Sequence, residues 1–300
     1  MAMAEIITSK ETLVQTLKEP GSMPAPREVL MVTPSHFSVE YVINPHMEGN
    51  IGTVDKEKAR WQWEVIRDKF RMIGLRVHEM EGEPGFPDMV FSANQSLPYI
   101  DPDGNKHALM SIMHSGQRKD EVPYFEQWYR QHGYEVHYLD AEGISNFEGM
   151  GDAIWHFKKR ILWGGYGYRS SRQAYEAVSN TFDVPVVVLE LVHPAFYHLD
   201  TCFCTLDEKS VLIYPPAFTK EGLELIHAAF PVVIEAPEKE ALELFACNAC
   251  CPDGKNVIIQ KGCREVNKAL KENGFAFHEV DTSEFLKSGG SVFCMKLMLW

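Results

Sequence analysis

The sequence predicts an α/β fold, a five-bladed, pseudo-symmetric propeller whose repeats are of ββαβ type. Three observations predict it. Short apolar strands begin about every fifty residues after a first, longer unit, a period typical of repeat architectures. Each is followed by a helix-length segment and a second β-rich run. Each unit also has a further predicted strand with polar residues at unusual positions, and rotational repetition brings such equivalent elements close to one axis.

The regular elements are predicted from apolar periodicity and from the turn residues between them. The first strands cover 29–32, 108–112, 160–163, 211–214 and 257–259. The helices cover 55–73, 124–131, 171–181, 220–229 and 264–273. The second β-rich runs cover 75–80, 134–139, 184–191, 232–236 and 275–280. In the first helix, Trp63, Ile66 and Phe70 recur at helical spacing, which indicates a core-facing stripe rather than a cofactor site.

The polar residues concentrate in the fourth element of each unit, predicted over 88–94, 146–152, 197–201, 244–248 and 289–297. If these elements meet near the axis, six side chains from distant parts of the chain lie together. They are Asn94, Glu148, Asp152, His198, Asp200 and Cys294. An ordinary βα-rich sheet whose loops happen to contain polar residues remains an alternative.

The predicted domain organisation is an N-terminal helix and linker over 1–26, followed by a single domain over 27–300. The helix is predicted over 5–19 and ends at Pro20-Gly21. With 45% hydrophobic residues, the chain has enough apolar side chains for a substantial core. The N-terminal segment is expected to be an appendage to that core.

The charge of the chain limits its partners. A net charge of -13 argues against nucleic acid and anionic membranes, which both bind basic surfaces, and favours a small cationic ligand. The sequence contains no apolar run long enough to span a membrane and no signal-peptide pattern at its start. Seven cysteines in such a chain are expected to be reduced thiols, so we expect a cytoplasmic protein. The oligomeric state is left open.

The predicted cluster contains the groups needed for nucleophilic catalysis. Cysteine alone is more often a small core residue, so Cys294 gains significance only from its predicted neighbours. A thiol needs a base or a positive environment to ionise at neutral pH, and His198 is the candidate base. Residues two apart on a strand share a face, so Asp200 is expected to project beside His198. Glu148 adds a carboxylate next to a glycine-containing segment.

Carboxylates, an amide, an imidazole and a thiol together suit a planar cation with several N–H donors and an electrophilic carbon. A guanidinium or amidinium group has these properties. The carboxylates would bind its nitrogens while the thiolate attacks the central carbon, and the histidine would transfer a proton to the departing amine.

Several motifs resemble those of the guanidino-group-modifying (pentein) superfamily. They are Glu-Gly-x-Gly-Asp at 148–152, His-Leu-Asp at 198–200 and Gly-Gly-x-x-x-Cys at 289–294. Within that superfamily the chain is most similar to the arginine dihydrolases, which convert arginine to ornithine, carbon dioxide and ammonia. The segments 41–50 and 91–94 are similar to dihydrolase signatures, and the likeness extends from about residue 29 to the C-terminus.

The resemblance implies a role for each matching residue. Cys294 would be the nucleophile that forms a covalent amidino-cysteine intermediate, and His198 the general acid and base. Glu148 and Asp200 would bind the guanidinium, with support from Asp152. The resemblance also concerns the other substrate-binding residues. It implies that Asn94 promotes action on the ureido product as well, and that Asn44 belongs to the dihydrolase signature. Arg118 and Arg169 would bind the α-carboxylate of the substrate. No organic cofactor is expected, because attack of a thiolate on a guanidinium carbon requires none, and no metal ligand is assigned.

Other functions remain open at this point. An arginine deiminase or dimethylarginine dimethylaminohydrolase would stop at citrulline, and an amidinotransferase would pass the amidino group to an amine. A guanidino-binding regulatory protein is the alternative without catalysis. The unexplained stretch with Cys247, Cys250 and Cys251, with Cys202 and Cys204 upstream, could instead supply zinc ligands, although the spacing fits a structural zinc site poorly.

Overall fold

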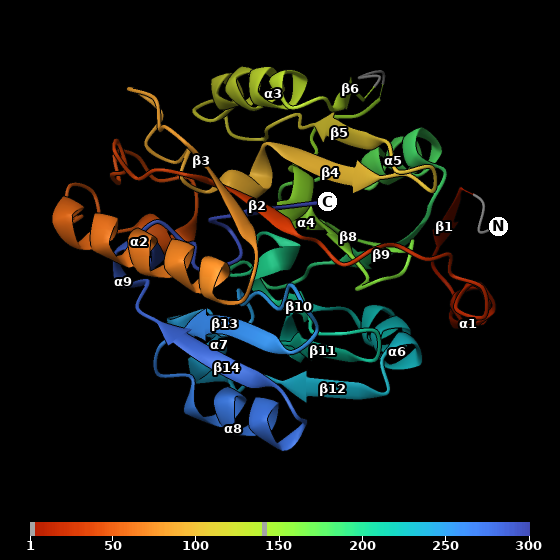
Figure 1. The fold of residues 1–300 in the computed structure, drawn as a ribbon. Helices are drawn as coiled ribbons and strands as arrows, with labels where there is room; N and C mark the ends of the chain where they lie inside the picture. Colours follow the sequence, from red (N-terminus) through yellow and green to blue (C-terminus); the bar gives the residue numbers. More distant parts are fainter. Residues whose placement is uncertain (1–3, 140–142) are drawn as a thin grey trace.

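The computed structural model describes residues 4–139 and 143–300 (Figure 1). These residues form five small sheets. In four of them a central strand pairs in parallel with one neighbour and antiparallel with another. A helix connects the two parallel strands, because parallel neighbours need a crossover connection. The fifth sheet has the parallel pair and one antiparallel bridge, between Cys250 and Ile258.

The bounds of these elements follow the repeat. The central strands are β2 (Glu28–Val32), β5 (Lys106–Met110), β8 (Leu162–Tyr166), β11 (Ser210–Ile213) and β13 (Asn256–Gln260). The connecting helices are α2 (Lys56–Met72), α3 (Val122–Gln131), α5 (Ala174–Phe182), α6 (Lys220–Ala229) and α8 (Arg264–Glu272). The parallel partners are β3 (Arg76–Met80), β6 (Glu135–His137), β9 (Pro185–Glu190), β12 (Val232–Glu235) and β14 (Ala276–Val280). The predicted first strands, helices and second β-rich runs are confirmed within a few residues.

Local interactions explain why α2 forms where the sequence predicts it. The Asp55 side chain accepts a hydrogen bond from the backbone N–H of Lys58 at 3.0 Å and caps the first turn. Trp63, Ile66 and Phe70 are buried along one face, which confirms the predicted core-facing stripe. Burial of that face joins the helix to the common apolar core.

The fourth elements were predicted as strands, and this prediction was wrong. The structure has a 3₁₀ helix at Ser92–Asn94, α4 at Gly149–Asp152, a 3₁₀ helix at Leu199–Thr201, and turns at 246–248 and 292–295. Each leads into the antiparallel strand or bridge of its sheet: β4 (Ser96–Ile100), β7 (Ala153–Trp155), β10 (Phe203–Thr205), the bridge of Cys250, and β15 (Leu297–Leu299).

Close backbone packing is one reason for these tight turns. Gly149 has a φ of +51°, and a Cβ at this position would lie 2.3 Å from the carbonyl oxygen of Ser96. Only glycine fits such an approach without strain. Since Leu199–Thr201 is helical, His198 and Asp200 do not project together from one strand face, as the sequence analysis expected.

The N-terminal segment also differs from its prediction. Residues 1–3 of the predicted segment lie outside the described residues. Glu5–Ile7 forms a strand, β1, which pairs in parallel with β9, and the helix α1 covers only Lys10–Thr16. Leu13 and Met23 are buried in the core. The described part of the segment therefore completes a sheet rather than forming an appendage.

The two ends of the domain meet in one sheet. β15 pairs antiparallel with β2, with Leu297 opposite Leu30. Figure 1 shows the five connecting helices around the outside of the molecule, with the C-terminus near its middle. The remaining helices are α7 (Glu238–Leu244), α9 (Ser283–Leu286) and 3₁₀ helices at Pro45–Met47, Lys119–Glu121 and Pro215–Ala217. No helix within 4–139 or 143–300 is long and apolar enough to cross a membrane.

The pairing of β15 with β2 predicts a large effect of shortening Leu297, which is fully buried. Leu297→Ala should lower the free energy of unfolding by about 2–5 kcal/mol, because it removes buried methyl groups and leaves a cavity. Urea unfolding followed by circular dichroism measures this. Met72→Ala, at an exposed position on α2, should change the same free energy by less than about 0.5 kcal/mol. Equal effects of the two substitutions would contradict a stabilising role for this closure.

Candidate active site

Six of the nine predicted site residues line one cavity: Asn44, Asn94, Arg118, Arg169, His198 and Cys294. The other three, Glu148, Asp152 and Asp200, are buried directly behind this lining. The residues come from all parts of the chain, as the repeat predicted. Turns just before the antiparallel strands, rather than the predicted strand faces, contribute six of the nine: Asn94, Glu148, Asp152, His198, Asp200 and Cys294. Asn44, Arg118 and Arg169 come from other loops.

Cys294 lies in the turn before β15, and two side chains from elsewhere in the chain form hydrogen bonds with it. Its Sγ donates a hydrogen bond to Oδ2 of Asp200 at 3.1 Å, and Nδ2 of Asn248 donates to Sγ at 3.1 Å. Asn248 also accepts from the backbone N–H groups of Ser291 and Cys294, at 3.0 and 3.3 Å. Asn248 thus fixes both the loop and the thiol. Sequence analysis missed it, although it ends the fourth element predicted at 244–248.

The electrostatics at the thiol favour its neutral form. Burial raises the pKa of Cys294 well above its usual range, and the neighbouring Asp200 carboxylate raises it further. Burial also raises the pKa of Asp200, to about 7, against the lowering effect of its hydrogen bonds with Cys294 and Asn248 and of the charge on Lys296. A cation beside Asp200 would reverse this balance, because it would favour both the carboxylate and the thiolate.

His198 engages Glu148 rather than the thiol. Its Nε2 lies 2.5 Å from Oε2 of Glu148, which also accepts from Arg169 at 3.4 Å. Oε1 of Glu148 accepts from the backbone N–H of His114 at 2.8 Å. Burial opposes ionisation of Glu148, but His198, Arg169 and Arg118 outweigh it and hold its pKa at about 2. Glu148 is therefore an ionised group that orients the imidazole.

Asp152 supports the same histidine from behind. Its two oxygens accept hydrogen bonds from Ser170 Oγ at 2.7 Å and from the backbone N–H of Leu199 at 3.0 Å. Burial raises the pKa of Asp152 to about 6, against the effects of the charge on His198 and of these hydrogen bonds. Because both oxygens bind protein groups, Asp152 fixes the turn that begins at His198 and does not line the cavity.

Seven buried side-chain polar atoms have no hydrogen-bond partner within the described part of the chain, and two of them belong to predicted site residues: Oδ1 of Asp200 and Nδ2 of Asn94. Arg118 explains the orientation of Asn94, since its Nη1 donates to Oδ1 of that side chain at 2.8 Å. The other Arg118 donors bind Glu121 and the carbonyl oxygens of Asp88 and Phe91. Unsatisfied buried polar atoms are costly, so such a pair indicates a place for a polar ligand.

Other residues of the lining include groups suited to an amino acid. Arg169 donates to the carbonyl oxygen of Ile43 at 2.7 Å, and its guanidinium lies over the ring of Tyr197 at 4.8 Å. Asn44 donates to the carbonyl oxygen of Ser288 at 3.0 Å. Asp88, which sequence analysis did not select, also lines the cavity, and burial raises its pKa.

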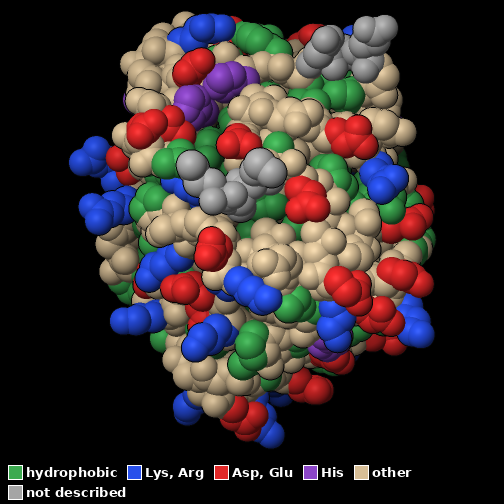
Figure 2. Space-filling model, turned by 90° about the vertical axis from the view of Figure 1, so that its right-hand side faces the viewer, with side chains coloured by type: hydrophobic (Ala, Val, Ile, Leu, Met, Phe, Trp, Pro, Cys, Tyr) green, Lys and Arg blue, Asp and Glu red, His purple; other side chains and the backbone are tan. Residues whose placement is uncertain are grey.

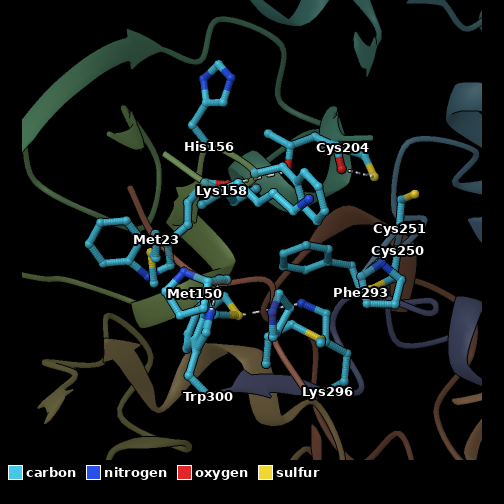
Figure 3. Close-up of a pocket in the computed structure, with 18 residues that line it drawn as sticks. Met23, Met150, His156, Lys158, Cys204, Cys250, Cys251, Phe293, Lys296 and Trp300 are labelled. Carbon is cyan, nitrogen blue, oxygen red and sulfur yellow. Dashed lines mark hydrogen bonds between the residues drawn. The ribbon is translucent and has the colours of Figure 1, made fainter. Parts of the chain in front are cut away.

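A second pocket lies behind the cysteine turn (Figure 3). Lys296, two residues after Cys294, is fully buried in its wall. The Nζ of Lys296 lies 3.5 Å from Sδ of Met150 and 3.1 Å from the ring centroid of Phe293. Cys204, Cys250 and Cys251 line the same pocket, so part of the cysteine-rich stretch forms an apolar wall here. Lys296 was another residue that sequence analysis missed.

Comparison with known proteins decides the family. The model of a family described as "N,N dimethylarginine dimethylhydrolase, eukaryotic" matches residues 40–299. The chain belongs to this family. The expected relationship to guanidino-group-modifying enzymes of the pentein superfamily is therefore confirmed. The match begins after α1 and β2 and ends at β15, so it includes every residue of the cavity.

Two curated relatives of this chain are described as hydrolytic enzymes. A bifunctional arginine dihydrolase/ornithine cyclodeaminase, ArgZ of Synechocystis, is 36% identical over 90% of this chain, which spans only 37% of that protein. The N(G),N(G)-dimethylarginine dimethylaminohydrolase of Mycobacterium tuberculosis is 34% identical over 91% of this chain and 86% of its own length.

A solved structure gives the corresponding likeness in three dimensions. The N-terminal domain of ArgZ, bound to its substrate, superposes with a TM-score of 0.84 and 36% identity, covering 91% of this chain and 97% of that domain. The same domain has also been solved, as an asparagine-to-serine variant, covalently bonded to a reaction intermediate. The α/β fold of this chain is thus the fold of that domain.

The charge of Asp200 predicts a measurable change in thiol reactivity. In Asp200→Asn, the alkylation of Cys294 by iodoacetamide should reach its half-maximal rate at a pH lower by roughly one unit or more, because the negative charge that opposes the thiolate is gone. Mass spectrometry of the Cys294 peptide at a series of pH values measures the rate. Glu272→Gln, which changes an exposed acid on α8, serves as the control. An unaltered profile in Asp200→Asn would show that this carboxylate does not govern the thiol.

Proposed function

We propose that this chain is a five-bladed α/β propeller (pentein) that hydrolyses the guanidino group of arginine to ornithine, carbon dioxide and ammonia. Each of the five sheets is taken as one blade, with β15 and β2 closing the ring. The reaction proceeds through a covalent adduct on Cys294, with His198 as general acid and base. The observation that carries this proposal is that Asn94 and Cys294 line the cavity, while Asp200, which is hydrogen-bonded to Cys294, keeps one buried oxygen without a partner among the described residues.

The free acceptor at Asp200 supports binding of a guanidinium. Its Oδ1 is buried without a partner among the described residues, while Oδ2 already binds Cys294. A guanidinium that donates to Oδ1 lies next to the sulfur, so its positive charge lowers the pKa of the Cys294 thiol. The substrate itself then promotes formation of the thiolate that attacks it.

The remaining lining supports recognition of the amino-acid end. Arg169 is fixed by Tyr197 and Ile43, and its remaining N–H groups suit an α-carboxylate. Asp88 offers a carboxylate to the α-ammonium group. Asn44 fixes the Ser288 backbone beside it. Arg118 has most of its donors bound to protein, so its main role is to orient Asn94.

The proposed reaction consists of two rounds of chemistry at the same carbon of the substrate. The Cys294 thiolate forms a bond to the guanidino carbon, one terminal nitrogen receives a proton from His198, and ammonia leaves. Water, deprotonated by His198, attacks the same carbon and breaks the C–S bond, which gives citrulline. A second round at the ureido carbon releases another ammonia and leaves a carbamate, which decomposes to ornithine and carbon dioxide. Two waters enter in total.

Asn94 supports the second round specifically. A guanidinium has only donors, whereas a ureido group presents an oxygen that accepts. Because Arg118 occupies Oδ1 of Asn94, the side chain presents its unpaired Nδ2 donor. That donor suits the ureido oxygen. A carboxylate in its place would bind the guanidinium better and would favour a deiminase that stops at citrulline, the main alternative.

The partner of this site is a small cationic guanidino substrate. The acidic net charge of -13 supports attraction of such a ligand. All seven cysteines are free and buried, which supports the proposed cytoplasmic, reducing compartment. A regulatory protein that only binds guanidines is disfavoured, because the nucleophile, imidazole and carboxylates are all present.

The first test is turnover of L-arginine. Purified protein should release ornithine and about two ammonia per arginine, as the thiolate route requires; chromatography and an ammonia assay measure both. Cys294→Ala should abolish turnover but still bind L-arginine in calorimetry. Cys251→Ala, which changes a thiol of the second pocket, is the matched control and should keep activity. Turnover by Cys294→Ala would exclude this cysteine as the nucleophile.

The second test concerns the products. Asn94→Asp should shift the products from ornithine towards citrulline, because a carboxylate loses the donor to the ureido oxygen. The ornithine-to-citrulline ratio during arginine turnover, and the rate with citrulline as substrate, measure the shift. Unchanged proportions would contradict the role given to the Asn94 amide.

A further inference from the structure

A group of potential metal ligands lies outside the catalytic cavity, on the sheet of β4, β5 and β6. It consists of His107, Glu135 and His137, whose ligand atoms all lie within 4.8 Å of one another. None of the three lines the cavity with Cys294. Figure 2 shows histidine and acidic side chains together near the top of the molecule, at the height where this sheet lies in Figure 1.

The strand register explains the proximity. β5 and β6 are parallel, with His107 opposite Glu135. Glu135 and His137 are two residues apart on β6, so they project from the same face of the sheet. Nδ1 of His107 lies 3.0 Å from Nε2 of His137. The Glu135 carboxylate oxygens lie 3.6 Å from that Nδ1 and 3.9 Å from that Nε2.

A second carboxylate orients the first histidine. Oδ2 of Asp101, in the turn between β4 and β5, lies 3.3 Å from Nε2 of His107. Asp101 is itself fixed by Asn105 and by the backbone N–H of Asp103. When Nε2 donates its proton to Asp101, Nδ1 presents its lone pair towards His137 and Glu135. Carboxylates behind metal-binding histidines commonly have this arrangement.

The distances suit a zinc ion. In a tetrahedral site, two nitrogens that each lie about 2.0–2.1 Å from zinc are about 3.3–3.4 Å apart, so the two rings, now 3.0 Å apart, need to separate only slightly. Two histidines with one glutamate are a known zinc ligand set. The side chains of His107 and His137 are 13% and 23% exposed, so the group is shielded but accessible from solvent.

We propose that His107, His137 and Glu135 form a divalent-metal site of the zinc class that joins β5 to β6, with Asp101 as the orienting group behind His107. One coordination position remains for water. The site is separate from the Cys294 chemistry, and its role is to stabilise this sheet.

Titration with zinc and with cobalt(II) tests the proposal on the full-length protein. Wild type should bind one equivalent and show a higher melting temperature with zinc. Asp101→Asn should weaken zinc binding by about 10–100-fold, as for other orienting carboxylates, and His107→Ala and His137→Ala should weaken it more. Cobalt should give a spectrum typical of nitrogen and oxygen ligands, without the intense band of a thiolate.

His278→Ala is the matched control, because His278 is a part-buried histidine on β14 with Asn256 as its partner. It should bind zinc as wild type does. Absence of zinc binding by wild type would overturn the proposal and leave the two rings joined by a simple hydrogen bond. Equal binding by His137→Ala and wild type, or a thiolate band with cobalt, would also overturn it.

Discussion

The antiparallel pairing of β15 with β2 is the constraint on which the site depends. It joins the last residues of the chain to the first sheet of the repeat, and the turn with Cys294 lies immediately before β15. The carbonyl oxygen of Cys294 accepts a hydrogen bond from the backbone N–H of Ala93 at 3.1 Å. The proposed nucleophile is thereby fixed against the turn that contains Asn94.

Two buried carboxyl groups near this turn have pKa values shifted in opposite directions. Glu148 is ionised because His198 and Arg169 surround it, and it orients the imidazole. Asp200, beside Cys294, has a raised pKa because burial outweighs its hydrogen bonds. A cationic ligand beside Asp200 would supply positive charge and so lower the pKa of this carboxyl group. In the proposed function, a guanidinium enters a site whose other groups are already in position, which limits the cost of reorganisation.

The sequence predicted the elements that depend on local periodicity. The stripe with Trp63, Ile66 and Phe70 gave α2 directly, and the fivefold recurrence brought Asn94, His198 and Cys294 to one cavity. The turns that contain the site residues were predicted as strands. Their conformation depends on contacts between repeats, such as the approach of Gly149 to Ser96, which no single stretch of sequence reveals.

Individual roles were harder to predict than proximity. Arg118 was expected to bind a substrate carboxylate, but most of its donors bind protein groups such as Glu121. Asn248 was missed because its role depends on distant partners, Asp200 and Cys294, to which it donates. Lys296 was missed because lysine is rarely buried in proteins, yet here it is fully buried. Proximity follows from topology, whereas hydrogen-bond partners follow from side-chain packing.

The most direct measurement is the mass of the protein after a rapid acid quench during turnover of L-arginine, followed by mapping of the modified peptide. If Cys294 is the nucleophile, the peptide that contains Cys294 should gain a mass equal to arginine less one ammonia. The Cys294→Ala variant should show no such added mass. An adduct on another cysteine, or turnover without any adduct at all quench times, would contradict the proposed nucleophile.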